Sequence, residues 1–316
     1  MANLLVASLK DLSVPHFLTS AIIQATKASS NKLVILLISP YFSEEASHTR
    51  HWHAVQRILT FTYVQATKVA YDNNNVLMHL DVLLKAKNEV LPQHLYSQFN
   101  HYYSITGDTL PEHITVHLSQ SNHTTIPPQH DSHPVPDTPP QPITDLPSTY
   151  PVVALGGTFD HLHSGHKILL SMAAYITNRK LIVGITDDVL LKNKANKHVM
   201  ENITERSNKV RDFLTLFKPS IHPDIVPITD VYGPTGWDPD IQALVVSKET
   251  LSGGDAIAKH RKAHNLPALQ PFLIDVISAT NASLDGDDAD WLKKHKLSST
   301  YIREWIVANA NQSKEN

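Results

Sequence analysis

The stretch "VVALGGTFDHLHSGHKILLSMA" (residues 152–173) joins an apolar run to a helical pattern through two glycines and two histidines. An apolar run without polar alternation is typical of a parallel strand that is covered on both faces. Gly156 and Gly157 allow the backbone to turn sharply and leave room for a ligand beside the main chain. Strand, glycine turn and helix in this order predict a doubly wound sheet with a site at the carboxyl end of the strand.

The residues that begin the helix indicate an anion site. Ser164 is the predicted N-cap, and Gly165 removes a side chain from the first turn. His163 and His166 are three residues apart and therefore lie on one side of that turn. Free amides and the positive end of the helix dipole favour negative charge there. Together these groups predict a receptor for phosphate oxygens.

Other ligand motifs fit this stretch poorly. The chain lacks the G-x-x-x-x-G-K-[ST] pattern of a P-loop and the G-x-G-x-x-G pattern of dinucleotide-binding folds. A zinc site at the two histidines would need further ligands, and neither cysteine nor HExxH is present. No residue of the chain is therefore predicted to be a metal ligand.

Apolar runs and helical patterns alternate over residues 151–309, which predicts one Rossmann-like catalytic domain with a parallel sheet. A short disordered tail is expected at 310–316. The predicted strands are 151–155, 180–186, 224–228, 241–247 and 271–278, and the predicted helices are 166–177, 203–217, 255–264 and 300–307.

A second α/β domain is predicted at residues 1–120, with strands at 3–8, 32–39 and 76–84 and helices at 15–27 and 49–70. It contains no H-x-G-H, so it is either a degenerate copy of the fold or a docking surface. Residues 121–150 are rich in proline and poor in large apolar residues, which predicts a disordered linker.

Composition limits the class of protein. The chain has 316 residues, a formal net charge of −3 and no cysteine, which excludes disulfides and thiolate zinc sites. The near-neutral charge gives no reason to expect nucleic acid or an anionic membrane as a partner. No apolar run approaches the ~18 residues of a membrane span, and the start does not resemble a signal peptide. We expect a cytoplasmic protein.

Two motifs carry a resemblance to a known superfamily. "GTFDHLHSGH" (157–166) resembles the T/HxGH signature of the nucleotidyltransferases, and "KLSSTYIREWI" (296–306) is similar to their ISSTxxR motif. These motifs, with "LIVGITDDVLLKNK" (181–194) and "YGPTGWDPDIQALVVSKETLSGG" (232–254), resemble the eukaryotic, fungal-type phosphopantetheine adenylyltransferase family over about residues 151–308. The resemblance implies transfer of AMP from ATP, with Mg²⁺, to 4′-phosphopantetheine in coenzyme A biosynthesis.

The resemblance also implies roles for individual residues. His166 would bind the α- and β-phosphates and stabilise the transition state, with His163 beside it. Thr158 would position the attacking phosphate together with a lysine, for which Lys192 is preferred, Lys194 is second and Lys197 is less favoured. Arg206 either faces the site or forms a surface salt bridge, and Asp160 is expected to be structural. The implied nucleotide-binding residues are Gly157, Phe159, Ser247, Thr250, Ser298, Ser299, Thr300 and Arg303.

Two alternatives remain open at this stage. Another member of the superfamily, such as a cytidylyltransferase for a phospho-alcohol, would share the first motif, although its R-T-E-G-I-S-T-S motif is absent. A catalytically dead scaffold of coenzyme A pathway enzymes would share the fold. Because the chain has no P-loop, the resemblance also implies that a separate dephospho-CoA kinase performs the next step.

Overall fold

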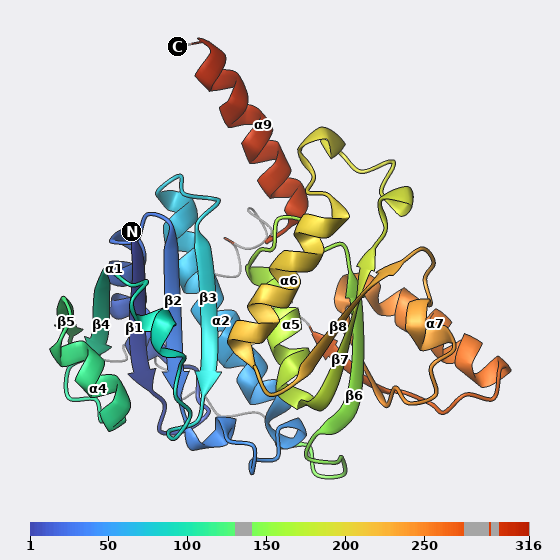
Figure 1. Cartoon of the computed structure of the whole chain (residues 1–316), viewed down its shortest axis with the longest axis horizontal. Helices are drawn as coiled ribbons and strands as arrows, with labels where there is room; N and C mark the ends of the chain where they lie inside the picture. Colours follow the sequence, from blue (N-terminus) through green and yellow to red (C-terminus); the bar gives the residue numbers. More distant parts are fainter. Residues whose placement is uncertain (130–140, 275–290, 292–296, 316) are drawn as a thin grey trace. The chain divides into compact units, whose positions relative to one another are not determined.

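The computed structural model of the chain describes residues 1–129, 141–274, 291 and 297–315. Within these residues the chain forms two compact units, one over 1–129, 141–146 and 291 and one over 147–274 and 297–315 (Figure 1). Each unit contains a five-stranded parallel sheet. None of the helices in the described ranges is long and apolar enough to cross a membrane.

The first unit has the strand order β3-β2-β1-β4-β5. Its strands are β1 (Ala2–Ser8), β2 (Lys32–Ile38), β3 (His79–Lys85), β4 (His101–Ile105) and β5 (His123–Ile126). Its helices are α1 (Thr19–Lys27), α2 (Trp52–Asp72), α3 (Gln93–Tyr96) and α4 (Glu112–Ser119), with 3-10 turns η1 (His16–Leu18), η2 (Pro40–Phe42) and η3 (Thr49–His51). The interior residues of β1 and β2 are buried, as expected of strands covered on both faces.

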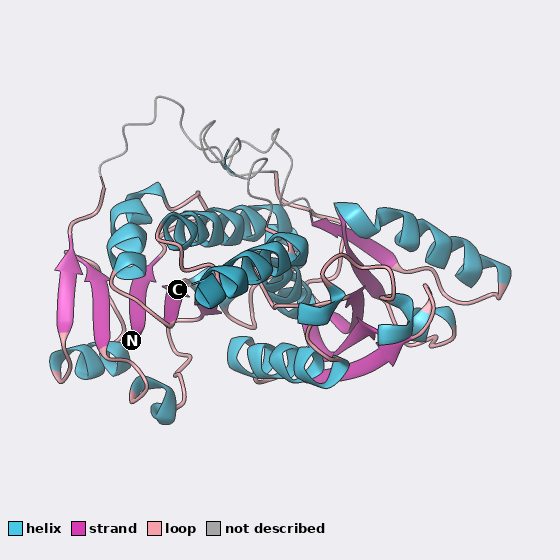
Figure 2. Cartoon of the chain, turned by 90° about the horizontal axis from the view of Figure 1, so that it is seen from above, coloured by secondary structure: helices cyan, strands magenta, loops and turns pink. Residues whose placement is uncertain are grey.

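The second unit has the strand order β10-β9-β6-β7-β8. Its strands are β6 (Tyr150–Gly157), β7 (Thr177–Thr186), β8 (His222–Ile228), β9 (Ala243–Ser247) and β10 (Gln270–Ile274). Its helices are α5 (Ser164–Ile176), α6 (Ile203–Phe217), α7 (Leu251–Ala263) and α9 (Ser299–Glu315), with 3-10 turns η4 (Asp188–Leu190), η5 (Lys197–Val199), η6 (Gly233–Gly236) and η7 (Lys248–Thr250). Helices lie on both sides of this sheet (Figure 2).

The two sheets share one topology. Counted from the first strand of its own unit, each sheet has the order 3-2-1-4-5. In this arrangement the order reverses between the first and fourth strands, which are β1 and β4 in one unit and β6 and β9 in the other. Ligands of open α/β folds bind at this point, outside the carboxyl ends of the strands. The shared order favours the interpretation of the first unit as a copy of the fold.

An apolar cluster from β6, β7, β9, α7 and the residues just before β9 holds the second sheet together. Its buried members are Val152, Ala154, Ile182, Ile241, Leu244, Val246 and Ile257. Burial of these side chains from water is the main favourable contribution to folding here. The cluster fixes β6 beside β9, so the ends of these two strands are held next to each other.

The structure differs from the sequence-based prediction at several places. Residues 123–126 of the expected linker form β5, because Ile126 is buried and the strand pairs with β4. Residues 130–140 of that segment lie outside the described residues. The expected tail at 310–316 continues α9 as far as Glu315. The elements β4 and α4 were not predicted, and residues 275–278 of the last predicted strand also lie outside the described residues.

Candidate active site

The turn after β6 has a strained backbone. Phe159 and His161 adopt positive φ angles of 52° and 44°, which non-glycine residues rarely do. Phe159 is fully buried, and a Cβ atom on Gly157 would lie 3.1 Å from its ring. The absence of a side chain at Gly157 therefore leaves room for the Phe159 ring. Strain of this kind persists where the surrounding structure imposes it, which is common at functional sites.

His163 and His166 stack at the start of α5. Their ring centroids are 3.8 Å apart with an interplanar angle of 27°. His163, and not Ser164 as predicted, is the N-cap of α5, because its Nδ1 accepts a hydrogen bond of 3.2 Å from the Gly165 amide. An accepting Nδ1 carries no proton in the neutral ring, so the His163 proton is on Nε2. Nε2–H is then available to donate to a ligand.

Both imidazoles are neutral at pH 7. Burial lowers the pKa of His166 to about 3, and the nearby Asp160 carboxylate opposes this shift. Burial also lowers the pKa of His163 well below its usual value, and His166, Lys167 and His161 add to the effect. Nδ1 of His166 is buried without a hydrogen-bond partner, which favours its proton on Nε2. Two neutral donors beside a helix start are suited to phosphate oxygens, and a bound polyanion would raise both pKa values.

The C-terminal motif contacts the turn after β6. Ser299 Oγ donates a hydrogen bond of 2.8 Å to the carbonyl oxygen of Asp160. A Cβ atom on Gly165 would lie 3.2 Å from the carbonyl oxygen of Leu297, so only glycine permits this approach without displacement. Ser298 Oγ accepts a hydrogen bond of 3.3 Å from the Tyr301 amide and so caps the start of α9. The two predicted motifs therefore meet.

Arg303 lies beneath this contact, with only 2% of its surface exposed. Its Nη1 is 2.6 Å from Asp160 Oδ2, its Nε donates to the carbonyl of Ala195 at 2.8 Å, and its Nη2 donates to Thr300 Oγ1 at 3.3 Å. All three nitrogens are thus engaged by the protein. The resemblance implied that Arg303 binds the nucleotide, whereas here it connects chain segments.

The candidate lysines lie in a segment that we call the lysine loop (residues 187–202, between β7 and α6). Lys192, Lys194 and Lys197 are exposed, and Leu191 is buried and anchors the loop. The loop is also held near its end, because His161 Nε2 is 2.8 Å from the carbonyl of Val199. Exposed ammonium groups on an anchored loop can reach a ligand phosphate.

Ser247 and Thr250 lie at the carboxyl end of β9, next to β6 in the sheet. They form a reciprocal cap, with the Ser247 amide donating to Thr250 Oγ1 at 3.0 Å. This cap begins the η7 turn that leads into α7. Their position at the reversal of strand order agrees with the adenosine-binding place that the resemblance implied.

Sequence reasoning underestimated two residues around the turn. Arg206 is completely buried and donates to the carbonyls of Thr158 and Thr186 at 2.7 and 2.9 Å. Glu201 accepts a hydrogen bond of 3.1 Å from the amide of His161 and pairs with Lys209. The only sequence signal was the "TERSNKV" pattern at the start of α6, which left the direction of Arg206 open.

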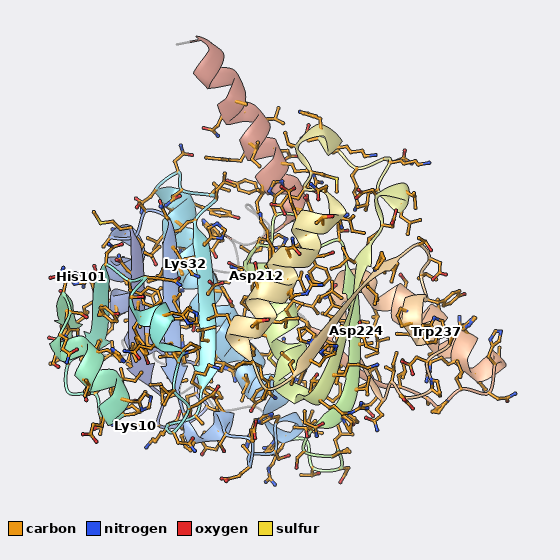
Figure 3. The ribbon with its side chains drawn as sticks, in the orientation of Figure 1. Lys10, Lys32, His101, Asp212, Asp224 and Trp237 are labelled. Carbon is orange, nitrogen blue, oxygen red and sulfur yellow. The ribbon has the colours of Figure 1, made fainter. Side chains whose placement is uncertain are left out.

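The described residues of the first unit place different groups at the equivalent edge. The amide of Ser8, at the end of β1, donates to the carboxylate of Asp108 at 2.7 Å. The buried apolar side chains of Leu9, Leu12 and Val14 follow this strand, while Lys10 is exposed (Figure 3). The Asp108 carboxylate thus occupies the position at the end of β1 where an anionic ligand would bind.

Comparison with known proteins agrees with this geometry. A family model described as cytidylyltransferase-like matches residues 154–305. The phosphopantetheine adenylyltransferase of Methanopyrus kandleri is 36% identical over 151 residues, which are 48% of this chain and 87% of that protein. The chain belongs to the cytidylyltransferase-like nucleotidyltransferases. The family and the Rossmann-like fold predicted from the two motifs are therefore confirmed.

A further relative matches about half of the chain. The phosphopantetheine adenylyltransferase of Saccharomyces cerevisiae is 42% identical over 160 residues, which are 51% of this chain and 50% of that protein. The chain thus spans about half the length of the first curated relatives that it matches. Among solved structures, a protein of unknown function from Archaeoglobus fulgidus is 32% identical, with 39% of this chain and 97% of that chain covered and a TM-score of 0.35.

Proposed function

We propose that the chain is a phosphopantetheine adenylyltransferase, which transfers AMP from ATP to 4′-phosphopantetheine. The observation that carries the proposal is the meeting of the two nucleotidyltransferase motifs, through Ser299 and Asp160, beside the stacked imidazoles. The relatives from S. cerevisiae and M. kandleri that bear this name support the choice of acceptor. ATP would lie across the ends of β6 and β9.

The reaction needs positioning and charge stabilisation more than proton transfer. A phosphate oxygen of the acceptor, already anionic, forms a bond to the α-phosphorus, and the bond from that phosphorus to the bridging oxygen of pyrophosphate breaks. Charge grows on the leaving pyrophosphate and on the α-phosphate oxygens. Nε2–H of His163 and of His166 and the first amides of α5 would donate to these oxygens.

The acceptor phosphate would be held on the other side of the turn. Thr158 lies at the end of β6 with a partly exposed side chain, and its hydroxyl would donate to that phosphate. An exposed lysine of the lysine loop, Lys192 or Lys194, would offset its charge. Bringing two polyanions together in this way removes much of the entropic barrier.

Mg²⁺ would enter bound to ATP. Within the described ranges, no three His, Cys, Asp or Glu side chains come together as a metal cage. Asp160, the carboxylate nearest the motif, already accepts from Arg303 and from the Glu201 amide. Mg²⁺ commonly keeps several waters and binds mainly through substrate phosphates, which fits a site of this kind.

The test is pyrophosphate release by the full chain. With MgATP and 4′-phosphopantetheine we expect turnover and the appearance of dephospho-CoA by mass spectrometry. CTP with phosphocholine tests the cytidylyltransferase alternative, and turnover with that pair alone would overturn the proposal. Binding of ATP without pyrophosphate release would favour a scaffold for other enzymes of the pathway.

A further inference from the structure

Two buried arginines have no direct role in the reaction described above. Arg206, near the start of α6, is 0% exposed, and Arg303, one turn into α9, is 2% exposed. A buried guanidinium is costly unless its donors are satisfied, so the groups that each one contacts define what it does. Both belong to the second unit.

Arg206 joins four points of the chain. Its Nη1 donates to the carbonyls of Thr158 and Thr186, its Nε donates to the carbonyl of Glu201 at 3.1 Å, and its Nη2 is 2.6 Å from Asp188 Oδ1. Thr158 begins the turn after β6, and Asp188 begins η4 in the lysine loop. One guanidinium therefore connects the turn after β6, which is the proposed phosphate-binding turn, to the start of the lysine loop.

Arg303 makes the same connection from the other side. Its Nη1 pairs with Asp160 in the turn after β6, and its Nε donates to the Ala195 carbonyl in the lysine loop. The anchor points on the loop are thus residues 188 and 195, and Lys192 and Lys194 lie between them. Each arginine touches the turn at one end and the loop at the other.

We propose that Arg206 and Arg303 are positioning residues that fix the lysine loop relative to the phosphate-binding turn, and so fix the acceptor phosphate relative to the α-phosphate. The idea rests on the proposed function for its consequence in catalysis. A guanidinium has five donors in a rigid fork, whereas an ammonium is a single flexible point charge. Lysine at either position keeps the charge, but its single nitrogen cannot reproduce the separated contacts that the three guanidinium nitrogens make.

The proposal gives Arg303 a role that differs from nucleotide binding. If Arg303 contacted the triphosphate, its loss would weaken ATP binding first. If it positions the loop, its loss acts on the acceptor and on the rate, because a displacement of about 1 Å at reacting groups can cost on the order of a hundredfold in rate. A purely structural role would lower stability without changing either parameter selectively.

The first experiment compares Arg206→Lys and Arg303→Lys with Arg211→Lys in the full chain. Arg211 is an exposed residue of the same helix as Arg206, and its Nη1 donates to Asn208 Oδ1 at 3.1 Å. Hydrogen–deuterium exchange of peptides from residues 187–200 should be about tenfold faster or more in the first two variants and unchanged in the third. The KM for 4′-phosphopantetheine should rise, while the Kd for ATP stays within about threefold of wild type.

A second variant leaves the packing of the buried core in place. Asp188 is half exposed, so Asp188→Ala removes one end of the Arg206 connection without emptying the core. We expect the same selective effect on loop exchange and on the acceptor KM. Asp212→Ala, which removes an exposed carboxylate on α6, is the matched control and should change neither (Figure 3).

The outcomes separate the positioning role from the proposed function. Unchanged exchange of the lysine loop in Arg206→Lys, Arg303→Lys and Asp188→Ala would overturn the positioning role. A loss of ATP affinity as large as the rise in the KM for 4′-phosphopantetheine would also overturn it. Exchange needs no turnover, so it decides the positioning role even if wild-type protein releases no pyrophosphate. That last result would instead overturn the adenylyltransferase proposal.

Discussion

Asp160 Oδ2 lies 2.6 Å from Arg303 Nη1, and both side chains are buried although 143 positions separate them in the chain. The pair joins the first nucleotidyltransferase motif to the second. Asp160 Oδ1 also accepts a hydrogen bond of 3.0 Å from the Glu201 amide, so the carboxylate has charged and neutral donors. A buried ion pair of this kind contributes little net free energy of folding but is costly to break, because one charge is then left unpaired.

Replacing Asp160 by asparagine should therefore destabilise the protein strongly. We expect the free energy of unfolding to fall by about 3–5 kcal/mol, because the Arg303 guanidinium keeps its charge in a buried place. Urea unfolding of the purified variant measures the loss. The double variant Asp160→Asn with Arg303→Gln should lose less than the sum of the two single variants, and strictly additive losses would contradict the coupling.

His166→Ala should remove activity and spare the fold. The buried Nδ1 of His166 makes no hydrogen bond that the fold would lose, while its Nε2 is the expected donor to phosphate. Loss of one aimed donor to developing negative charge typically costs two to three orders of magnitude in kcat, or about 3–4 kcal/mol. Pyrophosphate release and thermal unfolding should be measured together. The control is His222→Ala, an exposed histidine at the amino end of β8, which should keep full turnover.

The two histidines should also make the protein sensitive to acid. Burial lowers the pKa of His166 from 6.5 to about 3 and lowers that of His163 in the same direction. Between these pH values the unfolded chain binds more protons than the folded one, so stability falls as pH falls below about 6.5. Urea unfolding at pH 7.5 and pH 5 should show a smaller loss for a His163→Gln/His166→Gln double variant than for wild type. Equal losses in the two proteins would argue against neutral buried imidazoles.

The local pattern of the sequence was sufficient for the turn after β6 and for α6, whose bounds match the prediction at both ends. Apolar runs predicted most of the strands, and the glycine, histidine and serine residues predicted motifs at strand and helix ends. The strand β4 was not predicted, because "HYYSI" is short and carries polar residues. Its burial depends on the packing of α1 and β1 around it. The contacts of Arg206 and Arg303 join residues far apart in the chain, and no local pattern in one sequence encodes such pairs.

Gly165→Ala tests whether the close approach of the two motifs matters for activity. The added Cβ would lie 3.1 Å from Cε1 of His163 and 3.2 Å from the Leu297 carbonyl oxygen, so the start of α9 or the imidazole must shift. Because the reacting groups tolerate little displacement, we expect kcat to fall about tenfold to a hundredfold. Gly253→Ala is the matched control. Gly253 lies in α7, and an alanine Cβ there would meet Val231 Cγ2 at an ordinary contact distance of 3.7 Å. That change should raise the free energy of unfolding by about 0.5–1 kcal/mol, as expected for alanine in a helix, and leave turnover unaltered. Equal turnover in both variants would mean that the motifs can separate without harm to catalysis.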